Sequence, residues 1–503
     1  MPNPVPTETE LKFLLDPDAE AGVVERAGLS APEKVRTLCS TYFDTPDRRL
    51  RSHGLALRLR DDGHGTIQTL KQAGAVTRGE WEKKVSAADI DIAALGATPA
   101  GAVLNGEAKD LAPVFQTRIE RRTRLCRDGG GQIEIAFDVG EIIAGERREP
   151  IREMELELKR GEPDALFRLA HKLSEGGDIR LSLESKSERG FRLADDTLLE
   201  PRRSAAAGVR ADMTAGQAFA ALGLGCLTQA AANSEILRAQ NRPEALHQLR
   251  VAIRRLRALI KAYEPMLGQG EGLLVEAELK WLAGQLDAAR DLDVFITAGF
   301  GPAVEALAEQ DFAALGHQLL KAQTGAYAKA QAAVRSPRCA ALWLEAASWI
   351  EAGGWTRAAD PVVVHLRDQP VEDFAAEALD HLRKVVRKRG RRFATLDAKG
   401  RHKLRIRAKR MRYVVEFFSP LFGDAKGRRG FLKRLKAMQT ALGELNDIAV
   451  ARGRLAGAAG LKAPAVTFAA GRVVGWREQG ERRQLKAAAR RVEAFCAAAA
   501  FWR

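Results

Sequence analysis

Residues 1–200 alternate between polar and apolar positions in short segments, which is the period of a half-buried β-strand. Turn-forming sequences rich in Gly and Asp, such as DDGHG and RDGGGQ, separate several of these segments. The clearest predicted strands cover residues 8–14, 55–60, 66–71, 132–138 and 153–159. The pattern therefore predicts a mainly β N-terminal region.

The polar positions of these strands carry charge in an unusual arrangement. Three sets share a strand face: Glu8, Glu10 and Lys12; Arg58 and Arg60; and Glu153, Glu155 and Glu157. One such strand alone is typical of a solvated sheet face. Taken together, the sets favour a closed barrel with a charged interior and an apolar exterior covered by helices. Such an interior can hold cations on one wall and phosphates on the others.

From residue 214 onward the apolar positions recur every three and four residues, which predicts amphipathic helices. Ala, Leu, Arg, Glu and Lys dominate here, and breaks such as GFGPAV and GGWTRAADPVV separate the helices. Residues 201–213 are rich in small and charged residues with one Pro. We therefore predict a β domain over residues 1–200, a linker over 201–213 and an all-α domain over 214–503.

The helical part contains an internal repeat. The segment HQLRVAIRRLRALIKAY begins at His247, and HKLRIRAKRMRYVVEFF begins 155 positions later at His402. Further along, KWLAGQLDAARDLDV and KAMQTALGELNDIAV match at an offset of 156, which aligns Lys280 with Lys436. The repeat predicts two related helical bundles packed as a pseudo-twofold pair.

Basic residues form one stripe on a helix in each copy, because offsets of 0, 3, 7 and 10 return to the same face. Like charges at this spacing repel by a few tenths of a kcal/mol per pair, so a repeated stripe is better explained by an absent anion than by a solvated helix face. Arg and Lys both suit phosphate oxygens, and no nucleophile stands beside either stripe, so we expect binding rather than catalysis. The stripes are His247, Arg250, Arg254, Arg257 and Lys261, and His402, Arg405, Lys409 and Arg412.

Charge is divided unevenly along the chain. Residues 1–200 hold 30 Lys and Arg against 36 Asp and Glu, whereas residues 201–503 hold 50 against 29. A surplus of this size indicates a polyanionic partner such as nucleic acid, an anionic membrane or polyphosphate.

The five cysteines are scattered, with no CxxC or Cys/His spacing, which argues against a disulfide framework or a zinc site. The N-terminal sequence lacks the basic and apolar regions of a secretory signal, and no apolar run approaches the roughly 20 residues that cross a bilayer. We therefore expect a cytoplasmic protein with no membrane association.

The paired His-x2-Arg-x3-Arg/Lys-x2-Arg helices resemble the CHAD domain, the conserved-histidine α-helical domain, over roughly residues 214–500. The resemblance implies two four-helix bundles that bind inorganic polyphosphate along a basic groove. It assigns the family's basic positions to the two stripes, and Lys280 and Lys436 are further candidates.

The N-terminal half resembles the CYTH domain, the triphosphate tunnel metalloenzymes. The opening signature Glu-x-Glu-x-Lys stands here as Glu8, Glu10 and Lys12. The remaining motifs follow in family order: YFDT at 42–45, LRLR with Arg58 and Arg60, TLK with Lys71, RGEWE with Arg78, Glu80 and Glu82, Thr-x-Ile-x-Arg ending at Arg121, FD with Asp138, EMELELK with Glu153 and Glu155, and SKSERG with Lys186 and Arg189. The resemblance implies an eight-stranded antiparallel tunnel, flanked by helices, that holds a linear triphosphate.

The resemblance also implies a role for each charged residue. Hydrolysis of triphosphate requires its negative charges to be neutralised before water approaches phosphorus. The expected phosphate ligands are Lys12, Arg58, Arg60, Lys71, Arg78, Arg121 and Lys186. The expected ligands of Mg2+ or Mn2+ are Glu8, Glu10, Glu153, Glu155 and Asp138. Lys12, Glu8 and Glu10 are the catalytic candidates, with Lys12 either a phosphate ligand or an aid to the attacking water.

Both resemblances point to the bacterial CYTH–CHAD inorganic triphosphatases. We expect a metal-dependent hydrolase of inorganic triphosphate that also binds polyphosphate and associates with polyphosphate granules. Three alternatives remain open: a class IV adenylate cyclase or a thiamine or nucleoside triphosphatase, a non-catalytic granule-binding protein, and RNA binding by the basic half. Nucleic acid is the least favoured partner, because the sequence carries no RNA-binding motif.

Overall fold

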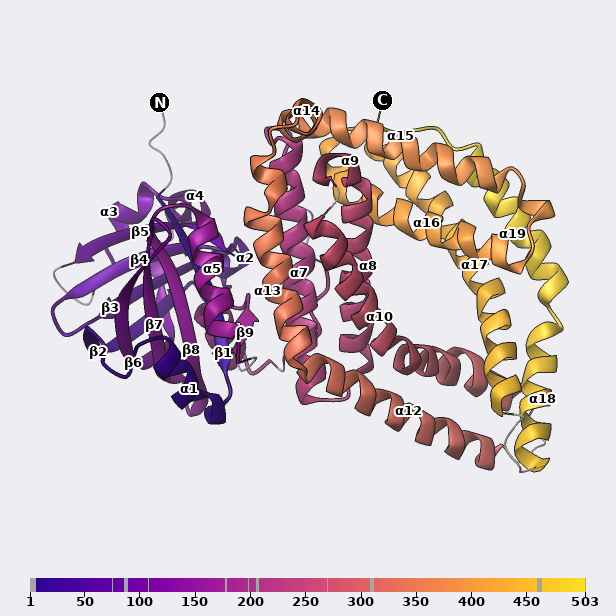
Figure 1. Cartoon of the computed structure of the whole chain (residues 1–503), viewed down its shortest axis with the longest axis horizontal. Coiled ribbons are helices and arrows are strands. Elements are labelled where there is room, and N and C mark those ends of the chain that lie inside the picture. Colours follow the sequence, from indigo (N-terminus) through magenta and orange to yellow (C-terminus); the bar gives the residue numbers. More distant parts are fainter. Residues whose placement is uncertain are drawn as a thin grey trace. The chain divides into compact units, whose positions relative to one another are not determined.

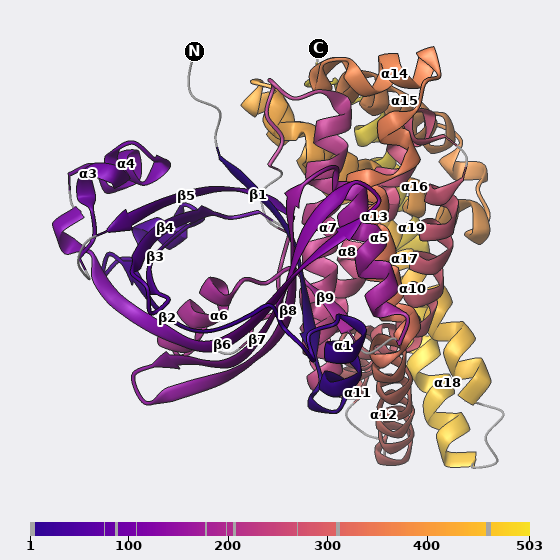
Figure 2. The same cartoon turned by 60° about the vertical axis from the view of Figure 1, so that its left-hand side comes forward.

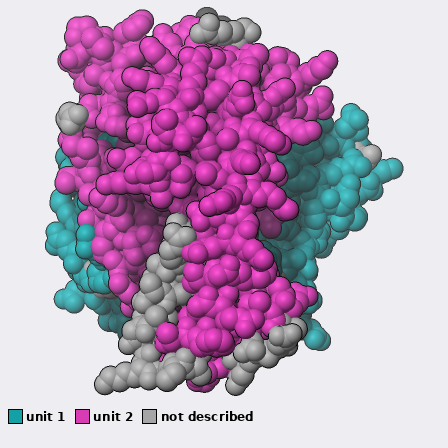
Figure 3. All heavy atoms as spheres, turned by 90° about the vertical axis from the view of Figure 1, so that its right-hand side faces the viewer, with its two compact units in different colours: residues 1–202, 231–236, 335–352 teal, residues 203–230, 237–334, 353–503 magenta. Residues whose placement is uncertain are grey.

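The computed structural model describes residues 6–74, 76–85, 89–106, 108–176, 179–197, 199–204, 208–268, 270–307, 312–458 and 464–502. The chain divides into two compact units (Figure 3). Residues 1–202, 231–236 and 335–352 make up the first unit, and residues 203–230, 237–334 and 353–503 make up the second.

Strands of the first unit form one antiparallel sheet in the order β5-β4-β3-β2-β6-β7-β8-β1-β9. An additional pairing between β1 and β5 closes strands β1 to β8 into an eight-stranded barrel (Figure 2). The strands are β1 (Thr7–Leu15), β2 (Lys34–Asp44), β3 (Leu55–Asp61), β4 (Thr66–Gln72), β5 (Thr77–Val85), β6 (Ala112–Asp128), β7 (Gly131–Ala144), β8 (Arg147–Arg160) and β9 (Ile179–Ser182). The predicted charged barrel is therefore a real closed sheet.

The first strand, β1, changes partner halfway along its length. Residues 7–9 pair with β5, whereas residues 12–15 pair with β9 on the same edge. On its other edge, residues 10–14 pair with β8. Glu8 and Glu10 therefore lie where the strand leaves β5, and the barrel is closed at the level of these two carboxylates.

The barrel has an apolar exterior. Alternate residues of β3 and β4, including Leu57 and Leu70, pack beneath the short helices, whereas Arg58 and Arg60 project from the other face of β3. The helices that follow or flank the strands are α1 (Glu20–Arg26), α2 (Arg49–Ser52), α3 (Ile92–Gly96), α4 (Pro99–Leu104), α5 (Pro163–Ser174) and α6 (Lys186–Ala194). Helix α5 lies against β8, and α6 lies within the curve of β6, β7 and β8 (Figure 2).

Every helix or strand assigned to the described residues after α6 is a helix (Figure 1). The α-helices are α7 (Ala215–Ala239), α8 (Pro243–Ala262), α9 (Glu264–Leu267), α10 (Glu271–Phe295), α11 (Gly301–Ala306), α12 (Ala313–Arg335), α13 (Pro337–Ala352), α14 (Pro361–Asp368), α15 (Val371–Gly390), α16 (Ala398–Phe418), α17 (Ala425–Ala458), α18 (Pro464–Glu478) and α19 (Glu481–Cys496). None of the helices in the described residues is long and apolar enough to cross a bilayer.

The two copies of the sequence repeat pack against each other in the second unit. Motif helix α8 lies against α10 and against α16, the motif helix of the second copy, and α16 lies against α17. Tyr263 and Phe418 follow or end the two motif helices at equivalent repeat positions, and their ring centroids are 6.2 Å apart. Arg255 on α8 also donates to Glu416 on α16 at 3.2 Å. The repeat therefore produces a shared seam between the two motif helices.

Candidate functional site

Five carboxylates project into the barrel from three neighbouring strands. They are Glu8 and Glu10 on β1, Asp138 on β7, and Glu153 and Glu155 on β8. Asp138 is 0% exposed, Glu153 2%, Glu10 5% and Glu155 8%. Carboxylates are rarely buried to this degree unless cations accompany them, so their partners determine what this interior can bind.

The pairing register of neighbouring strands brings three of these carboxylates next to cations. They are Asp138, Glu153 and Glu155. Asp138 is paired with Glu153 on one side and with Arg121 of β6 on the other. Lys12 is paired with Glu155 between β1 and β8. Directly paired residues have Cβ atoms about 4.5–5.5 Å apart, so these side chains contact one another without any loop to position them.

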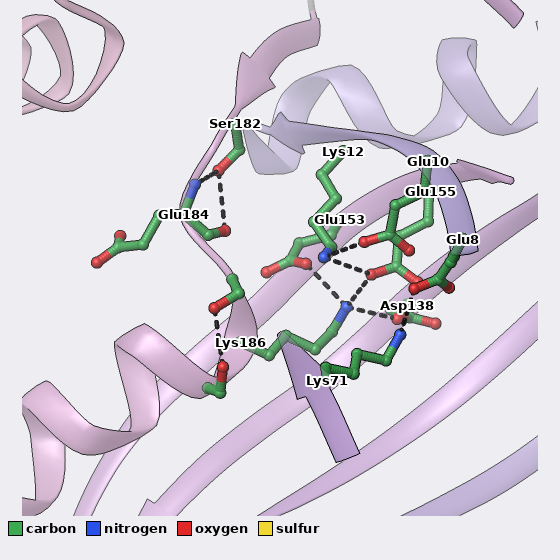
Figure 4. A network of polar contacts seen from close by, with 12 residues as sticks. Glu8, Glu10, Lys12, Lys71, Asp138, Glu153, Glu155, Ser182, Glu184 and Lys186 are labelled. Carbon is green, nitrogen blue, oxygen red and sulfur yellow. Dashed lines mark hydrogen bonds and ion pairs between the residues drawn. The ribbon is translucent and has the colours of Figure 1, made fainter. Parts of the chain in front are cut away.

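The ammonium of Lys186 sits at the centre of three carboxylates (Figure 4). Its Nζ lies 2.8 Å from oxygen atoms of Asp138, Glu153 and Glu155. Arg121 donates to both oxygens of Asp138, at 2.7 and 2.6 Å, and to Glu155 at 2.5 Å. Burial alone would raise the pKa of Glu155, but Lys186, Arg121 and Lys12 hold this pKa well below its usual range.

Two local features place Lys186 at this point. Ser185 and Glu188 form a reciprocal capping box, which starts α6 with Lys186 in its first turn. Gly190 then lets α6 approach β6, because a Cβ there would lie 2.0 Å from the Phe115 ring. The motif SKSERG is thus a helix start, a cation and a close-packing glycine in one segment.

Glu8 and Glu10 contact a second group of cations. Lys71 of β4 donates to Glu8 at 2.7 Å, and Arg78 of β5 bridges Glu8 and Glu10. Lys12 donates to Glu10 from the same strand. Although burial opposes it, these cations lower the pKa of both carboxyl groups. Both carboxylates are therefore ionised at neutral pH.

Arg58 and Arg60 line the wall formed by β3. Arg58 interacts with the hydroxyl of Tyr42, and its Nε has no hydrogen-bond partner among the described residues. Arg60 donates to Glu82 at 3.3 Å. Burial raises the pKa of Tyr42, but the Arg58 guanidinium outweighs burial and lowers it. An unpaired buried guanidinium N–H is a donor available to a ligand.

Sequence reasoning left three of the contacting residues without a role. Arg189 on α6 donates to Glu149 at 2.7 Å and also contacts Glu153, so it supports the Lys186 cluster from outside. Glu80 lies 3.0 Å from Lys71, and Tyr42 partners Arg58. All three stand within motifs that carry the family resemblance, and the motif order was the signal that could have identified them.

The carboxylate cluster suits a hard cation in its donor chemistry. Oxygen-only ligands are those that Mg2+ and Mn2+ prefer, and three of the carboxylates already converge on one cationic atom, Lys186 Nζ. Within the described residues, however, no three His, Cys, Asp or Glu side chains stand in a metal-ligating arrangement. The residues fit a divalent ion only where Lys and Arg side chains give up their contacts with these carboxylates.

The second unit holds a separate cationic region along the seam between α8 and α16. Arg254 of the first copy lowers the pKa values of Arg405 and Lys409 of the second copy, after burial as the leading cause. For Lys409 the result is a pKa of about 7. Like charges at this separation repel, so the two predicted stripes face one shared space rather than opposite sides of the molecule.

Several nitrogen atoms in this seam are buried and have no hydrogen-bond partner among the described residues. They belong to His247 (Nδ1), Arg250 (Nε), Arg254 (Nε), Arg257 (Nε) and Arg405 (Nε). Burial, followed by the nearby Arg290, also lowers the pKa of His247 to about 4, so this imidazole is neutral at physiological pH. Unpaired guanidinium N–H donors beside repelling cations are the features of a site that accepts an anion.

The outer members of the predicted stripes are arranged differently. Lys261 pairs with Glu264, and Arg412 donates to Glu416 at 2.7 Å. His402 is exposed and its Nδ1 lies 2.7 Å from the side-chain oxygen of Asn446. Lys280 and Lys436 are exposed on α10 and α17. Roles in binding for these residues stay predictions.

Comparison with known proteins identifies both halves of the chain. The CYTH domain family profile matches residues 6–191, and the CHAD domain profile matches residues 221–456. The N-terminal part is 34% identical over 170 residues to an inorganic triphosphatase of Haemophilus influenzae, which is 32% of this chain and 47% of that protein. The chain therefore matches about half the length of this curated relative.

A solved structure supports the helical assignment. The crystal structure of the CHAD domain from the plant Ricinus communis is 31% identical and superimposes with a TM-score of 0.50. The alignment covers 59% of this chain and 97% of the plant domain. The polypeptide thus combines two domain types that are each recognised independently.

Proposed function

Since this chain joins a CYTH domain to a CHAD domain, we propose that it hydrolyses inorganic triphosphate in its barrel and binds inorganic polyphosphate on its helical domain. The inorganic triphosphatase of Haemophilus influenzae supports the substrate. The observation that carries the proposal is the interior in which five buried carboxylates and at least five Lys and Arg side chains are mutually neutralised.

Binding of triphosphate is favoured because it offers the interior cations a new anion. Lys12, Lys71, Arg78, Arg121 and Lys186 all contact carboxylates inside the barrel. Arg58 has a free buried donor as well. Transfer of these cations to phosphate oxygens neutralises the substrate, which an attacking water molecule requires.

The carboxylates released by that transfer would hold the metal. Glu8, Glu10, Asp138, Glu153 and Glu155 would bind Mg2+ or Mn2+, which when bound polarises phosphate oxygens and lowers the pKa of a coordinated water molecule. Lys12 stands between Glu10 and Glu155 and would orient the terminal phosphate or the water beside it. Arg121, which donates to Asp138 and Glu155, would hold the phosphate from the β6 side.

Phosphate release tests the enzymatic part of the proposal. The full chain is assayed with triphosphate, ATP, thiamine triphosphate and long polyphosphate, each with Mg2+ and with Mn2+. The variant Glu8→Gln/Glu10→Gln should lose at least about 100-fold in kcat/KM, because both carboxylates are lost from the metal-binding set. Glu120→Gln removes a half-exposed carboxylate that pairs with Arg122 on the outer face of β6, and should leave the rate unchanged. Turnover of ATP to a cyclic product, or no turnover with any substrate, would contradict the proposal.

A further inference from the structure

The net positive charge of the helical part comes from the half of the domain that contains the second copy of the repeat. Residues 214–369 hold 15 Lys and Arg against 16 Asp and Glu. Residues 370–503 hold 32 Lys and Arg against 12 Asp and Glu. The sequence repeat therefore joins one nearly neutral half to one strongly basic half, although both halves carry the same histidine and arginine motif.

The helices that precede the two motif helices differ in the same way. In α7, which precedes α8, the charged residues are Glu235 and Arg238. In α15, which precedes α16, the last three turns contain five Lys and Arg. No ion pair within 4 Å joins Arg387, Lys388 or Arg389 to a carboxylate in the part of the chain that the structure describes. This basic surface has no counterpart in the first copy.

An acidic residue of α10 neutralises Arg250 of the first copy but has no counterpart at Arg405, whereas Arg257 and its equivalent Arg412 are each paired with a glutamate. Arg250 donates to Asp287 of α10 and to the carbonyl oxygen of Ala283 at 3.2 Å. Arg257 of α8 lies 3.4 Å from Glu276, which is also on α10. At the offset of 156, the positions equivalent to Asp287 and Glu276 are Gly443 and Leu432. Neither residue has a side chain that can accept a hydrogen bond from an arginine.

Arg405, the equivalent of Arg250, consequently lies against a glycine. Its Nε is 4.0 Å from where a Cβ of Gly443 would stand, and this nitrogen has no hydrogen-bond partner among the described residues. Arg254, Arg405 and Lys409 form no ion pair within 4 Å with any carboxylate in the described part of the chain. These three cations therefore form a part of the seam without a direct ion pair, although the charge of Asp447 favours the ionised forms of Arg405 and Lys409.

Exposed aromatic side chains are nearly absent from the basic half. Among the described Phe, Tyr and Trp residues after position 370, Phe468 is the one with a largely exposed ring, at 60%. Proteins that bind single-stranded nucleic acid stack bases on such rings. A polyanion without bases fits this surface better than RNA or DNA.

We infer that polyphosphate is held by the second copy of the repeat, on α15, α16 and α17 together with Arg254 of α8, and that Asp287 keeps Arg250 of the first copy from binding it. This inference rests on polyphosphate binding by the helical domain. Asp287 acts as an internal anion in the place where a phosphate would otherwise sit. In the second copy Gly443 stands in the place of Asp287, so Arg405 is left without a carboxylate there and can bind a phosphate.

Pseudo-symmetry supplies matched variants for the test. The affinity of the full chain for linear polyphosphate of one defined length is measured by isothermal titration calorimetry at two salt concentrations. Arg405→Gln should weaken binding roughly tenfold, the equivalent of a lost charge-assisted contact, whereas Arg250→Gln should change it by less than about threefold. Equal losses for the two variants would overturn the inference.

A second set of variants changes the residue that faces the arginine in each copy, Asp287 in the first and Gly443 in the second. Gly443→Asp should neutralise Arg405 and weaken binding roughly fivefold or more, while Asp287→Ala should free Arg250 and tighten binding roughly threefold or more. Gly443→Ala controls for the added Cβ, which meets no atom closer than 4.0 Å. Glu305→Ala on α11 controls for general loss of negative charge, because that exposed residue lies on a helix packed against α18 and residues 296–300.

The outcomes separate this inference from the proposed function. If the wild-type chain binds no polyphosphate at both salt concentrations, the proposed function is wrong. If it binds but Gly443→Asp and Asp287→Ala leave the affinity unchanged, the inference alone is overturned. If single-stranded RNA of equal charge binds more tightly than polyphosphate and responds to Gly443→Asp, the choice of partner is wrong.

Discussion

The ammonium of Lys186 on α6 lies 2.8 Å from a carboxylate oxygen of Glu153 on β8, with both side chains almost fully buried. The same ammonium also contacts Asp138 and Glu155 at 2.8 Å. One lysine from outside the barrel sheet therefore neutralises carboxylates from two strands. The acidic wall of the barrel interior is thus neutralised by cations of the protein itself.

Replacement of Lys186 by Met should destabilise the barrel. Loss of one partner of a buried ion pair costs about 3–5 kcal/mol, because the remaining charges stay buried without compensation. The free energy of unfolding is measured by denaturant titration monitored by far-UV circular dichroism. Lys172→Met is the control, since the Lys172–Asp128 pair is exposed and contributes no more than about 1 kcal/mol. Equal stability of the two variants would contradict the role given to Lys186.

Saturating Mn2+ should recover part of the stability lost in the Lys186→Met variant. Removal of the ammonium leaves three converging carboxylates, which form an oxygen-rich site for a divalent ion. Ligand binding to the native state raises the unfolding temperature, and the rise should be larger in the variant than in the wild type. Thermal unfolding with and without Mn2+ measures this difference. An equal shift in both proteins would show that the metal binds elsewhere.

Substitution of Gly190 by Ala should reduce triphosphate hydrolysis through the position of α6. The new Cβ would lie 2.0 Å from the Phe115 ring, so either the helix or the ring must move. Overpacking of this kind costs typically about 1–3 kcal/mol and would displace Lys186, which lies on the same helix. Gly96→Ala introduces the same methyl group where no atom lies within 4 Å, and its rate should match that of the wild type.

Polyphosphate binding should weaken as pH rises from 6 to 8. In the free protein the pKa of Lys409 is about 7, because burial and then Arg405 and Arg254 oppose its charge, with Asp447 acting in the other direction. Below pH 7 the ammonium is already present, whereas above pH 7 binding must take up a proton. Affinity should then fall by up to about tenfold per pH unit for this single group. Lys409→Arg keeps the charge and should flatten the profile, which separates Lys409 from titration of the phosphate chain itself.

Removal of divalent metal should affect the two domains differently. A chelator should abolish phosphate release, since the proposed chemistry requires the ion. The same chelator should leave polyphosphate binding unchanged, because the contacts proposed for the phosphate chain come from Arg and Lys side chains. Phosphate release and calorimetric titration on one preparation measure both effects. Loss of polyphosphate binding in the chelator would indicate that metal bridges contribute to it.

Much of the barrel interior was visible in the sequence. Alternation placed Glu153 and Glu155 on one face of a strand, and the order of motifs identified Arg121, Asp138 and Lys186. Both the strands and the helical repeat were predicted from periodicity, which depends on nearest neighbours along the chain. The roles of Arg189 and Tyr42 were not predicted, because each depends on a partner from another element: Glu153 across α6 and β8, and Arg58 across β2 and β3.

The amino-acid sequence by itself determined the domain types, the charged strand faces and the duplicated basic motif, because each is a pattern of residues close together in the chain. Only the tertiary structure decided which cation meets which carboxylate. Whether Arg250 is neutralised by Asp287 while Arg405 lies beside Gly443 depends on how α8 packs on α10 and how α16 packs on α17. Electrostatic energy depends on the distance between charges in space. Arginines at equivalent motif positions are therefore neutralised to different degrees once the helices have packed.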